Sequence, residues 1–359
     1  MHSATRKTRP ARTRALALLG AAIVSCGAVA ACSSGGSSST ADPSSTSAGT
    51  SKTLTNITIG YPSLTIHLLP FQVAIDQGFF AQQGLNVKLV ALNNSQTTIA
   101  GLTSDSVQFA GVGSSGVLAA AAQGAPVISL LAQDNGVPQD LMVSAKFASA
   151  NNLTSSSSIS TVVKALGHST FGVNGLTDTG LAHQLLGAYG VSSAGVRFAS
   201  LGSLSSLITS VTSGVVDAIF ASPPSSYKLS SDNTALLLGD AAKISSWPAD
   251  IYQYVLAANR TYVQSHPAIA KEVVAAVHQA VLFIKQHPGS VISSAQKVLT
   301  DYSPSVLQQS VSDLNWATNG AQSQAGWNAT IQFNVATGGV KAGATMPEGQ
   351  NWTDSYYSG

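Results

Sequence analysis

The feature that most constrains this chain is an internal repeat. The stretch 57–115 and the stretch 169–224 can be laid over each other, and their parts follow in the same order. In each, a short β-branched strand leads through a polar turn into a helical pattern that ends in glycine. A second strand, a Ser- or Asn-rich turn, an amphipathic helix and a third strand follow. A βαβαβ order predicts right-handed crossovers and a mainly parallel sheet, so we expect an α/β fold with two similar lobes.

The loops after the predicted strands are candidates for a binding cleft, because ligands of open parallel sheets bind beyond the carboxyl ends of the strands. These loops are 61–67, 93–96, 111–116, 174–180 and 221–227, and they are rich in small hydrogen-bonding residues. Backbone N–H groups at helix N-termini, together with hydroxyl groups, suit an anionic or strongly polar small molecule. The competing interpretation is that these residues are ordinary helix caps. The candidate ligand-binding residues are Ser63, Leu64, His67, Asn94, Gly113, Ser114, Ser115, Asp134, Leu176, Thr177, Asp178, Thr179, Ser222 and Tyr227.

Several of these candidates have a structural alternative. Asp134 and Asp178 can accept hydrogen bonds from an amine, amide or pyrimidine ligand, or they can cap a helix or a hinge turn. His67 can donate to a ligand or face solvent at a helix start. No arginine lies in any of the five loops, so a sulfonate or nitrate there depends on helix N-termini and hydroxyl groups. The aromatic candidates for stacking on a planar ligand are Tyr227, Tyr61 and Trp247, the last two with a core or hinge role as the alternative.

The N-terminal segment has the layout of a secretory signal. Five of the 17 Lys and Arg residues lie in the first 14 positions, and an uncharged run of small apolar residues follows. The run closes with VAAC, which resembles the lipobox of bacterial lipoproteins, whose cysteine is diacylated and becomes the new N-terminus. The alternative is an ordinary cleavage site with an incidental cysteine. We expect a signal peptide at 1–31 that includes Cys26, a lipid on Cys32, and a flexible Ser/Gly-rich tether at 32–53.

Composition narrows the partners and the chemistry. Beyond the N-terminus, 12 basic residues face 15 acidic ones and are scattered singly, so the basic stripe that nucleic acid requires is missing. The seven histidines are dispersed, with no H-E-x-x-H motif, and no G-x-S-x-G elbow occurs. We therefore expect no nucleic-acid partner, no metal, no cofactor and no enzyme activity.

Four segments together resemble the ABC-transporter substrate-binding proteins of the nitrate/sulfonate/taurine and thiamine-pyrimidine-precursor group. They are 60–90, 105–132, 170–191 and 211–224, and their most specific parts are QGFF…GL, SVQFA…AAAQGAP and SGVVDA. The likeness runs from about residue 55 to about residue 290.

This resemblance implies a type II periplasmic-binding-protein fold, in which a two-crossing hinge joins two βαβ lobes with the ligand between them. Lobe 1 is then 54–140 and 251–359, and lobe 2 is 141–250.

By the same resemblance, the protein is expected to be an extracytoplasmic solute-binding lipoprotein of an ABC importer. It would capture a sulfonate-, taurine- or nitrate-like solute and deliver it to a permease driven by an ATPase. We expect a monomer, anchored to the cell membrane on its extracytoplasmic face through Cys32. The alternatives are a binder of a pyrimidine or other planar vitamin precursor, a ligand-sensing lipoprotein without transport, and an enzyme of thiamine-precursor type. Those enzymes carry a cysteine-rich iron motif, whereas no cysteine follows Cys32 here.

Overall fold

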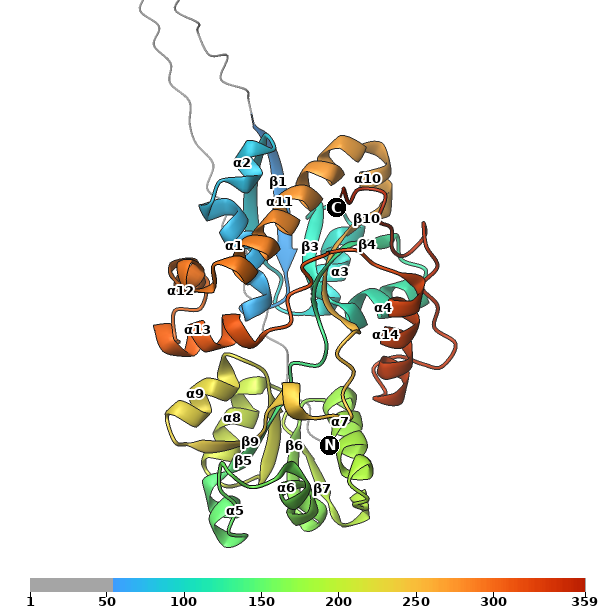
Figure 1. The fold of residues 1–359 in the computed structure, drawn as a ribbon. Helices are drawn as coiled ribbons and strands as arrows, with labels where there is room; N and C mark the ends of the chain where they lie inside the picture. Colours follow the sequence, from blue (N-terminus) through green and yellow to red (C-terminus); the bar gives the residue numbers. More distant parts are fainter. Residues whose placement is uncertain (1–53, 359) are drawn as a thin grey trace, which may run out of the picture. The chain divides into compact units, whose positions relative to one another are not determined.

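The computed structural model describes residues 54–358, which form two five-stranded sheets (Figure 1). The predicted signal peptide, Cys26, Cys32 and the tether lie outside the described residues. The first sheet has the order β2 (Leu85–Ala91), β1 (Thr55–Tyr61), β3 (Phe109–Gly113), β10 (Tyr252–Asn259), β4 (Val127–Asn135). The second has the order β7 (Arg197–Ser200), β6 (Thr170–Val173), β8 (Ala218–Ala221), β5 (Asp140–Ser144), β9 (Ala235–Gly239).

The two sheets repeat one topology, as the internal repeat predicts. In the first, β1 is parallel to β2 and β3, and β10 is antiparallel to β3 and β4. In the second, β6 is parallel to β7 and β8, and β5 is antiparallel to β8 and β9. The expected α/β fold is therefore confirmed, but each sheet is mixed, with two parallel and two antiparallel pairings, and not mainly parallel. In each sheet, the antiparallel strand is the one that directly follows a crossing from the other sheet: β10 in the first and β5 in the second.

The chain passes between the sheets twice, at 136–139 and at 240–251. The boundary expected after residue 140 lies one residue inside β5, because Asp140 already pairs with Ala221 of β8. These two crossings are the only chain connections between the strands of one sheet and those of the other within 54–358.

Helices cover both sheets. The α-helices are α1 (Leu69–Asp76), α2 (Phe79–Gln82), α3 (Ser95–Thr103), α4 (Ser114–Ala122), α5 (Ala145–Ala150), α6 (Ile159–Ala165), α7 (Leu176–Ala188), α8 (Leu204–Thr212), α9 (Ser225–Ser231), α10 (Arg260–Ser265), α11 (Pro267–Gln286), α12 (Ile292–Val298), α13 (Pro304–Asp313) and α14 (Gln324–Ala336). Short 3-10 turns are η1 (Ile66–Leu68), η2 (Leu166–His168), η3 (Ser193–Gly195), η4 (Ala241–Lys243) and η5 (Pro288–Val291).

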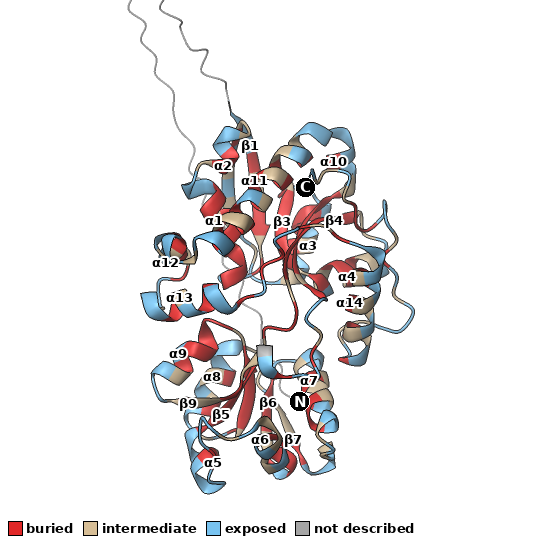
Figure 2. Cartoon of the chain, in the orientation of Figure 1, coloured by how far each residue is buried: buried red, intermediate tan, exposed pale blue. Residues whose placement is uncertain are grey.

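The cores lie between the strands and the inward faces of the helices, whose outward faces are exposed (Figure 2). On one face of the first sheet, Phe71 of α1 and Val274 of α11 belong to one apolar cluster. On the opposite face, Leu118 of α4 and Trp327 of α14 belong to another. Burying each such side chain contributes about 1.5–3 kcal/mol relative to leaving it exposed, so these faces fix the helices on the sheet.

The long helix α11 is a core helix, although its length and apolar composition would let it cross a membrane. It is the one helix among residues 54–358 that meets both criteria. Pro267 occupies its first turn, where a missing N–H is tolerated, and apolar residues recur at helical spacing from Ala270 to Ile284. That face is buried against the first sheet, which accounts for its apolar character.

The C-terminal helix α14 contacts both sheets' cores. Its Trp327 is buried in a cluster of the first sheet, whereas Phe333 packs against the cluster of the second. The backbone after α14 approaches α7 so closely that a Cβ on Gly180 would collide with the Thr337 carbonyl group. Only glycine fits at position 180, and α14 therefore joins the two halves independently of the crossings.

Candidate ligand-binding site

The inner helices at the carboxyl edges of the two sheets have uncapped N-termini. Helix α4 follows β3 and helix α7 follows β6, and the first turn of neither receives a hydrogen bond from a capping side chain. The helices that follow the outer strands differ, because Asn94 caps α3 and Ser203 caps α8. The first backbone N–H groups of an α-helix have no partner within it and carry its positive dipole end. The first turns of α4 and α7 are therefore suited to bind hydrogen-bond acceptors or anions.

The predicted residues of the first half lie around these edges, with different environments. Ser63 and Leu64 are exposed in the loop after β1, with 57% of Leu64 accessible. Gly113 is the N-cap of α4, Ser114 is buried in its first turn, and Ser115 is exposed. Small residues at this turn let a ligand approach the backbone closely.

The side chain of one predicted residue, Asn94, caps a helix. Asn94 Oδ1 accepts the backbone N–H of Thr97 at 2.8 Å, which is a helix N-cap. It stays a predicted ligand-binding residue, and it would have to leave this bond to use Oδ1 for a ligand.

The predicted residues of the second half surround the start of α7. Gly175 precedes the helix with a φ of 115°, a conformation that favours glycine, and Leu176 is 74% exposed. Thr177 is exposed, and Thr179 Oγ1 donates to the Gly175 carbonyl. Asp178 Oδ2 accepts the backbone N–H of Asn174 at 2.8 Å, which fixes the loop.

Asp178 also adds a negative charge near the first turn of α7. Burial raises the pKa of the Asp178 carboxyl, and the hydrogen bond from Asn174 opposes that rise. The hydrogen bond from the Asn174 N–H partly offsets the repulsion between this carboxylate and an anion.

The last two predicted residues lie at and near the start of α9. The Ser222 carbonyl accepts the N–H groups of Ser225 and Ser226. Tyr227 is buried and its hydroxyl donates to Asp313 of α13 at 2.8 Å. Burial raises the pKa of Tyr227, and nearby carboxylates raise it further, so this hydroxyl stays a donor. The bond links α9 to α13.

The other aromatic candidates are accounted for by packing. Trp247 is buried and meets Phe220 edge-on, with ring centroids 5.4 Å apart. Tyr61, at the end of β1, packs against the core beside α1.

His67 and Asp134 are brought together at the carboxyl edge of the first sheet. His67 Nδ1 lies 2.9 Å from Asp134 Oδ2, and both residues are buried. Tyr254 of β10 stacks on the imidazole at 4.6 Å, with an angle of 9° between the ring planes. Sequence reasoning identified the two ionisable residues but missed Tyr254.

The sequence does not indicate Tyr254 because the direction of its side chain depends on an irregularity in strand register. Two residues apart in a strand, Tyr252 and Tyr254 would share a face. A bulge in the pairing with β4 separates them, so Tyr252 contacts Trp327 and Tyr254 contacts His67. No turn or glycine in the sequence marks that bulge.

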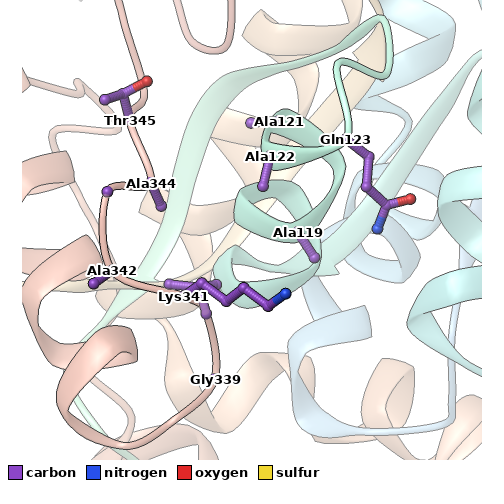
Figure 3. Close-up of a pocket in the computed structure, with 11 residues that line it drawn as sticks. Ala119, Ala121, Ala122, Gln123, Gly339, Lys341, Ala342, Ala344 and Thr345 are labelled. Atoms are coloured by element: carbon purple, nitrogen blue, oxygen red, sulfur yellow. The ribbon is translucent and has the colours of Figure 1, made fainter.

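Two cavities of the described residues lie away from the first turns of α4 and α7. One of about 660 Å³ lies between the far end of α4 and the segment 339–345, with Lys341 and Gln123 as its long polar side chains (Figure 3). Another of about 540 Å³ lies between α9 and α13, and both Asp140 and Tyr227 line it. Residues 54–358 contain no cluster of His, Cys, Asp or Glu with metal-binding geometry.

Two sheets of this order, joined by two crossings, define a periplasmic-binding-protein fold. A family model described as "NMT1/THI5 like" matches residues 65–291, which is more than half of the chain. The protein therefore belongs to the NMT1/THI5-like family. No curated protein matches the sequence.

Solved structures with this fold include binding proteins and an enzyme. The alkanesulfonate-binding protein SsuA of Xanthomonas axonopodis pv. citri, bound to MOPS, is 17% identical with a TM-score of 0.59, covering 79% of this chain and 93% of that chain. The nitrate-binding protein NrtA of Synechocystis PCC 6803 is 12% identical with a TM-score of 0.64, covering 81% and 83%. The desulfurization enzyme DSZB is 14% identical with a TM-score of 0.58, covering 80% and 93%. The resemblance seen in the sequence is confirmed at the level of family and fold, and function has to be argued from the site.

Proposed function

We propose that this protein is an extracytoplasmic solute-binding protein of an ABC importer. It captures a small anionic or strongly polar solute, such as a sulfonate, taurine or nitrate, and delivers it to a permease driven by an ATPase. The observation that carries this proposal is that α4 and α7, at the carboxyl edges of the two sheets, lack the side-chain caps that α3 and α8 have. The solute takes the place of the missing caps. The similarity to sulfonate- and nitrate-binding proteins supports it.

Binding without catalysis is the proposed activity. The two lobes, predicted as 54–140 with 251–359 and as 141–250, move about the crossings at 136–139 and 240–251, which act as the hinge. Solute bound to one lobe recruits the other, and the closed form docks on the permease.

A second candidate is a binder of a pyrimidine or other planar vitamin precursor. One observation favours it: among residues 54–358, the buried Asp134 Oδ1 has no hydrogen-bond partner, which leaves an acceptor for a ring nitrogen or an amine. A ligand-sensing lipoprotein without transport would use the same cleft.

A thermal-unfolding panel separates the solute classes. Methanesulfonate, taurine and nitrate are expected to stabilise the protein, because a ligand at 100 times its dissociation constant adds about 2.7 kcal/mol to the free energy of unfolding. Sodium chloride at equal ionic strength is the control. Stabilisation by an aminopyrimidine alone would indicate that the solute is planar and not anionic. If no compound stabilises the protein, both candidate functions are rejected.

The lipid anchor is proposed to be carried by Cys32, which lies outside the described residues. Replacing Cys32 with serine is expected to move the protein from the membrane fraction to the medium or to leave the precursor unprocessed, because no acyl chains hold it. Cys26→Ser is the matched control, since Cys26 is removed with the signal. Cell fractionation and fatty-acid labelling measure the result. A Cys32→Ser protein that stays processed and membrane-bound contradicts the anchor.

A further inference from the structure

Two contacts besides the chain crossings join the two predicted lobes, and they differ in chemistry. In the first, the α9–α13 contact, the Tyr227 hydroxyl donates to Asp313 at 2.8 Å, and the Ser225 and Tyr302 hydroxyl oxygens lie 2.9 Å apart. Tyr227 and Ser225 belong to α9, Asp313 ends α13, and Tyr302 lies in the loop before α13. The second, the α7–α14 contact, is the approach of α14 and Thr337 to α7. The first contact consists of hydrogen bonds, whereas the second consists of apolar and backbone packing.

The α9–α13 contact borders space that water can enter. Tyr227 and Asp313 line the cavity of about 540 Å³, and Ser225 and Tyr302 line another of about 340 Å³. Residues of both lobes bound each cavity, and each is large enough for several water molecules. When such groups part, water replaces each hydrogen bond, so one bond shifts the equilibrium by only about 2- to 13-fold. The α9–α13 contact therefore needs little free energy to open.

The α7–α14 contact is close-packed. Phe333 of α14 packs against the apolar cluster that includes Leu181 of α7. At Gly180 the two backbones approach so closely that a Cβ would collide with Thr337. Apolar surface that becomes exposed gains no replacement bond from water, and α14 is also fixed to the first sheet by the buried Trp327. This contact is therefore the harder of the two to break.

We infer that the two lobes separate at the α9–α13 contact and stay joined at the α7–α14 contact, so that solute enters and leaves beside α9. This inference rests on the proposed solute-binding function and assigns the residues that close the site. Rotation about the two crossings and α14 breaks the bonds of Tyr227 and Ser225 and leaves α7 against Thr337. Tyr302 and Asp313 are the closing residues of the first lobe, and they stabilise the closed form without touching the solute.

The closing residues can be replaced without altering any candidate ligand-binding residue. Tyr302→Phe keeps the aromatic ring, which packs against the first core, and removes only the hydroxyl. Asp313→Ala removes the acceptor of the Tyr227 hydroxyl at an exposed position. Without these two bonds, the ratio of open to closed protein is expected to rise at least about fivefold. Ser312→Ala is the matched control, because its hydroxyl accepts a hydrogen bond from Gln308 within α13.

Distances between spin labels measure where the lobes separate, and this measurement needs no solute. The full chain with Cys26 and Cys32 replaced by serine supplies a background without cysteine. Exposed positions replaced by cysteine carry the labels: Ser231 and Ser305 for the α9–α13 contact, and Ala188 and Ala336 for the α7–α14 contact. The second pair of labels is the internal reference for the first.

In Tyr302→Phe with Asp313→Ala, the α9–α13 labels are expected to show a longer and broader distribution of distances than in the unaltered protein and in Ser312→Ala. The α7–α14 labels are expected to show one narrow distribution in all three. Tyr302→Phe alone keeps one of the two bonds and is expected to give an intermediate shift, which tests the same contact if the double variant unfolds. An α9–α13 distribution that is the same in every protein refutes the closing residues. An α7–α14 distance that lengthens in the variant refutes the fixed side.

Methanesulfonate separates this inference from the proposed function. At a concentration that saturates binding, it is expected to shorten the α9–α13 distance in the double variant and to leave the α7–α14 distance unchanged. If methanesulfonate, taurine and nitrate have no effect while the double variant still opens the α9–α13 contact, the opening side is confirmed and the anionic solute is rejected. If a solute changes the α7–α14 distance instead, the inference is overturned and the proposed function stands.

Discussion

Replacing Trp327 with alanine is expected to lower the free energy of unfolding by about 3–5 kcal/mol. Trp327 is fully buried, its ring packs on Tyr252 at 5.2 Å, and its Nε1–H donates to Gln322. The substitution leaves a cavity and removes one of the two hydrogen bonds to the Gln322 amide oxygen, the other being donated by the Ser129 hydroxyl. Because α14 also packs on the second sheet through Phe333, we expect both sheets to lose protection from hydrogen exchange.

Urea unfolding measures this loss, and Gln332→Ala on the exposed face of the same helix is its control. The control is expected to stay within about 0.5 kcal/mol of the unaltered protein. A Trp327→Ala protein as stable as this control contradicts the role of α14 as a joint between the halves.

Replacing Asp140 with asparagine is expected to stabilise the protein by about 4 kcal/mol above pH 7. Asp140 is buried at the start of β5, and that burial raises the pKa of its carboxyl from 3.8 to about 7. The hydrogen bonds from Ser226 and Ala241 oppose the rise without cancelling it. Asparagine keeps both, since Oδ1 accepts from the Ala241 amide and Nδ2 donates to the Ser226 hydroxyl.

The sign of the pH dependence follows from the raised pKa. Between about pH 4 and pH 7 the folded protein holds a proton on Asp140 that the unfolded chain has lost, so its stability falls as pH rises through that range. Asparagine at 140 has no proton to lose. The difference between the two proteins is therefore expected to be small near pH 4 and largest above pH 7.

Urea unfolding across this pH range checks the difference, with the exposed Asp250→Asn as control. The control curve is expected to run parallel to that of the unaltered protein. A stability difference between Asp140→Asn and the unaltered protein that does not change with pH would show that the carboxyl is not the titrating group.

The repeat made most of the fold predictable from the sequence. Its strands and helices recur in one order, and the helical patterns end at Gly78 and Gly190, which both take positive φ values. The helix α11 was readable from Pro267 and its apolar spacing. The contribution of α14 was not readable, because a helix with apolar residues on more than one side does not show which sheet each of them contacts.

The candidate site, too, was only partly predictable from the sequence. Residues at strand ends were predictable because the carboxyl ends of parallel strands gather at one edge. The sequence did not show which of these strand ends leave a backbone N–H free. Asn94 at the start of α3 and Gly113 at the start of α4 both have residue types that are common at cap positions. Only the folded backbone distinguishes an engaged cap from an open one.

The sequence by itself indicated the class of fold and the edges of the sheets, and it offered His67 and Asp134 as candidate ligand-binding residues. Their pairing was decided only by the tertiary structure, because the two residues are 67 positions apart and meet after β1 and β4 have taken their places in one sheet. The same holds for Tyr254, whose face was set by a bulge in strand pairing. Local patterns encode which segments form strands and helices, whereas contacts across a sheet depend on register, which is fixed by packing of the whole core.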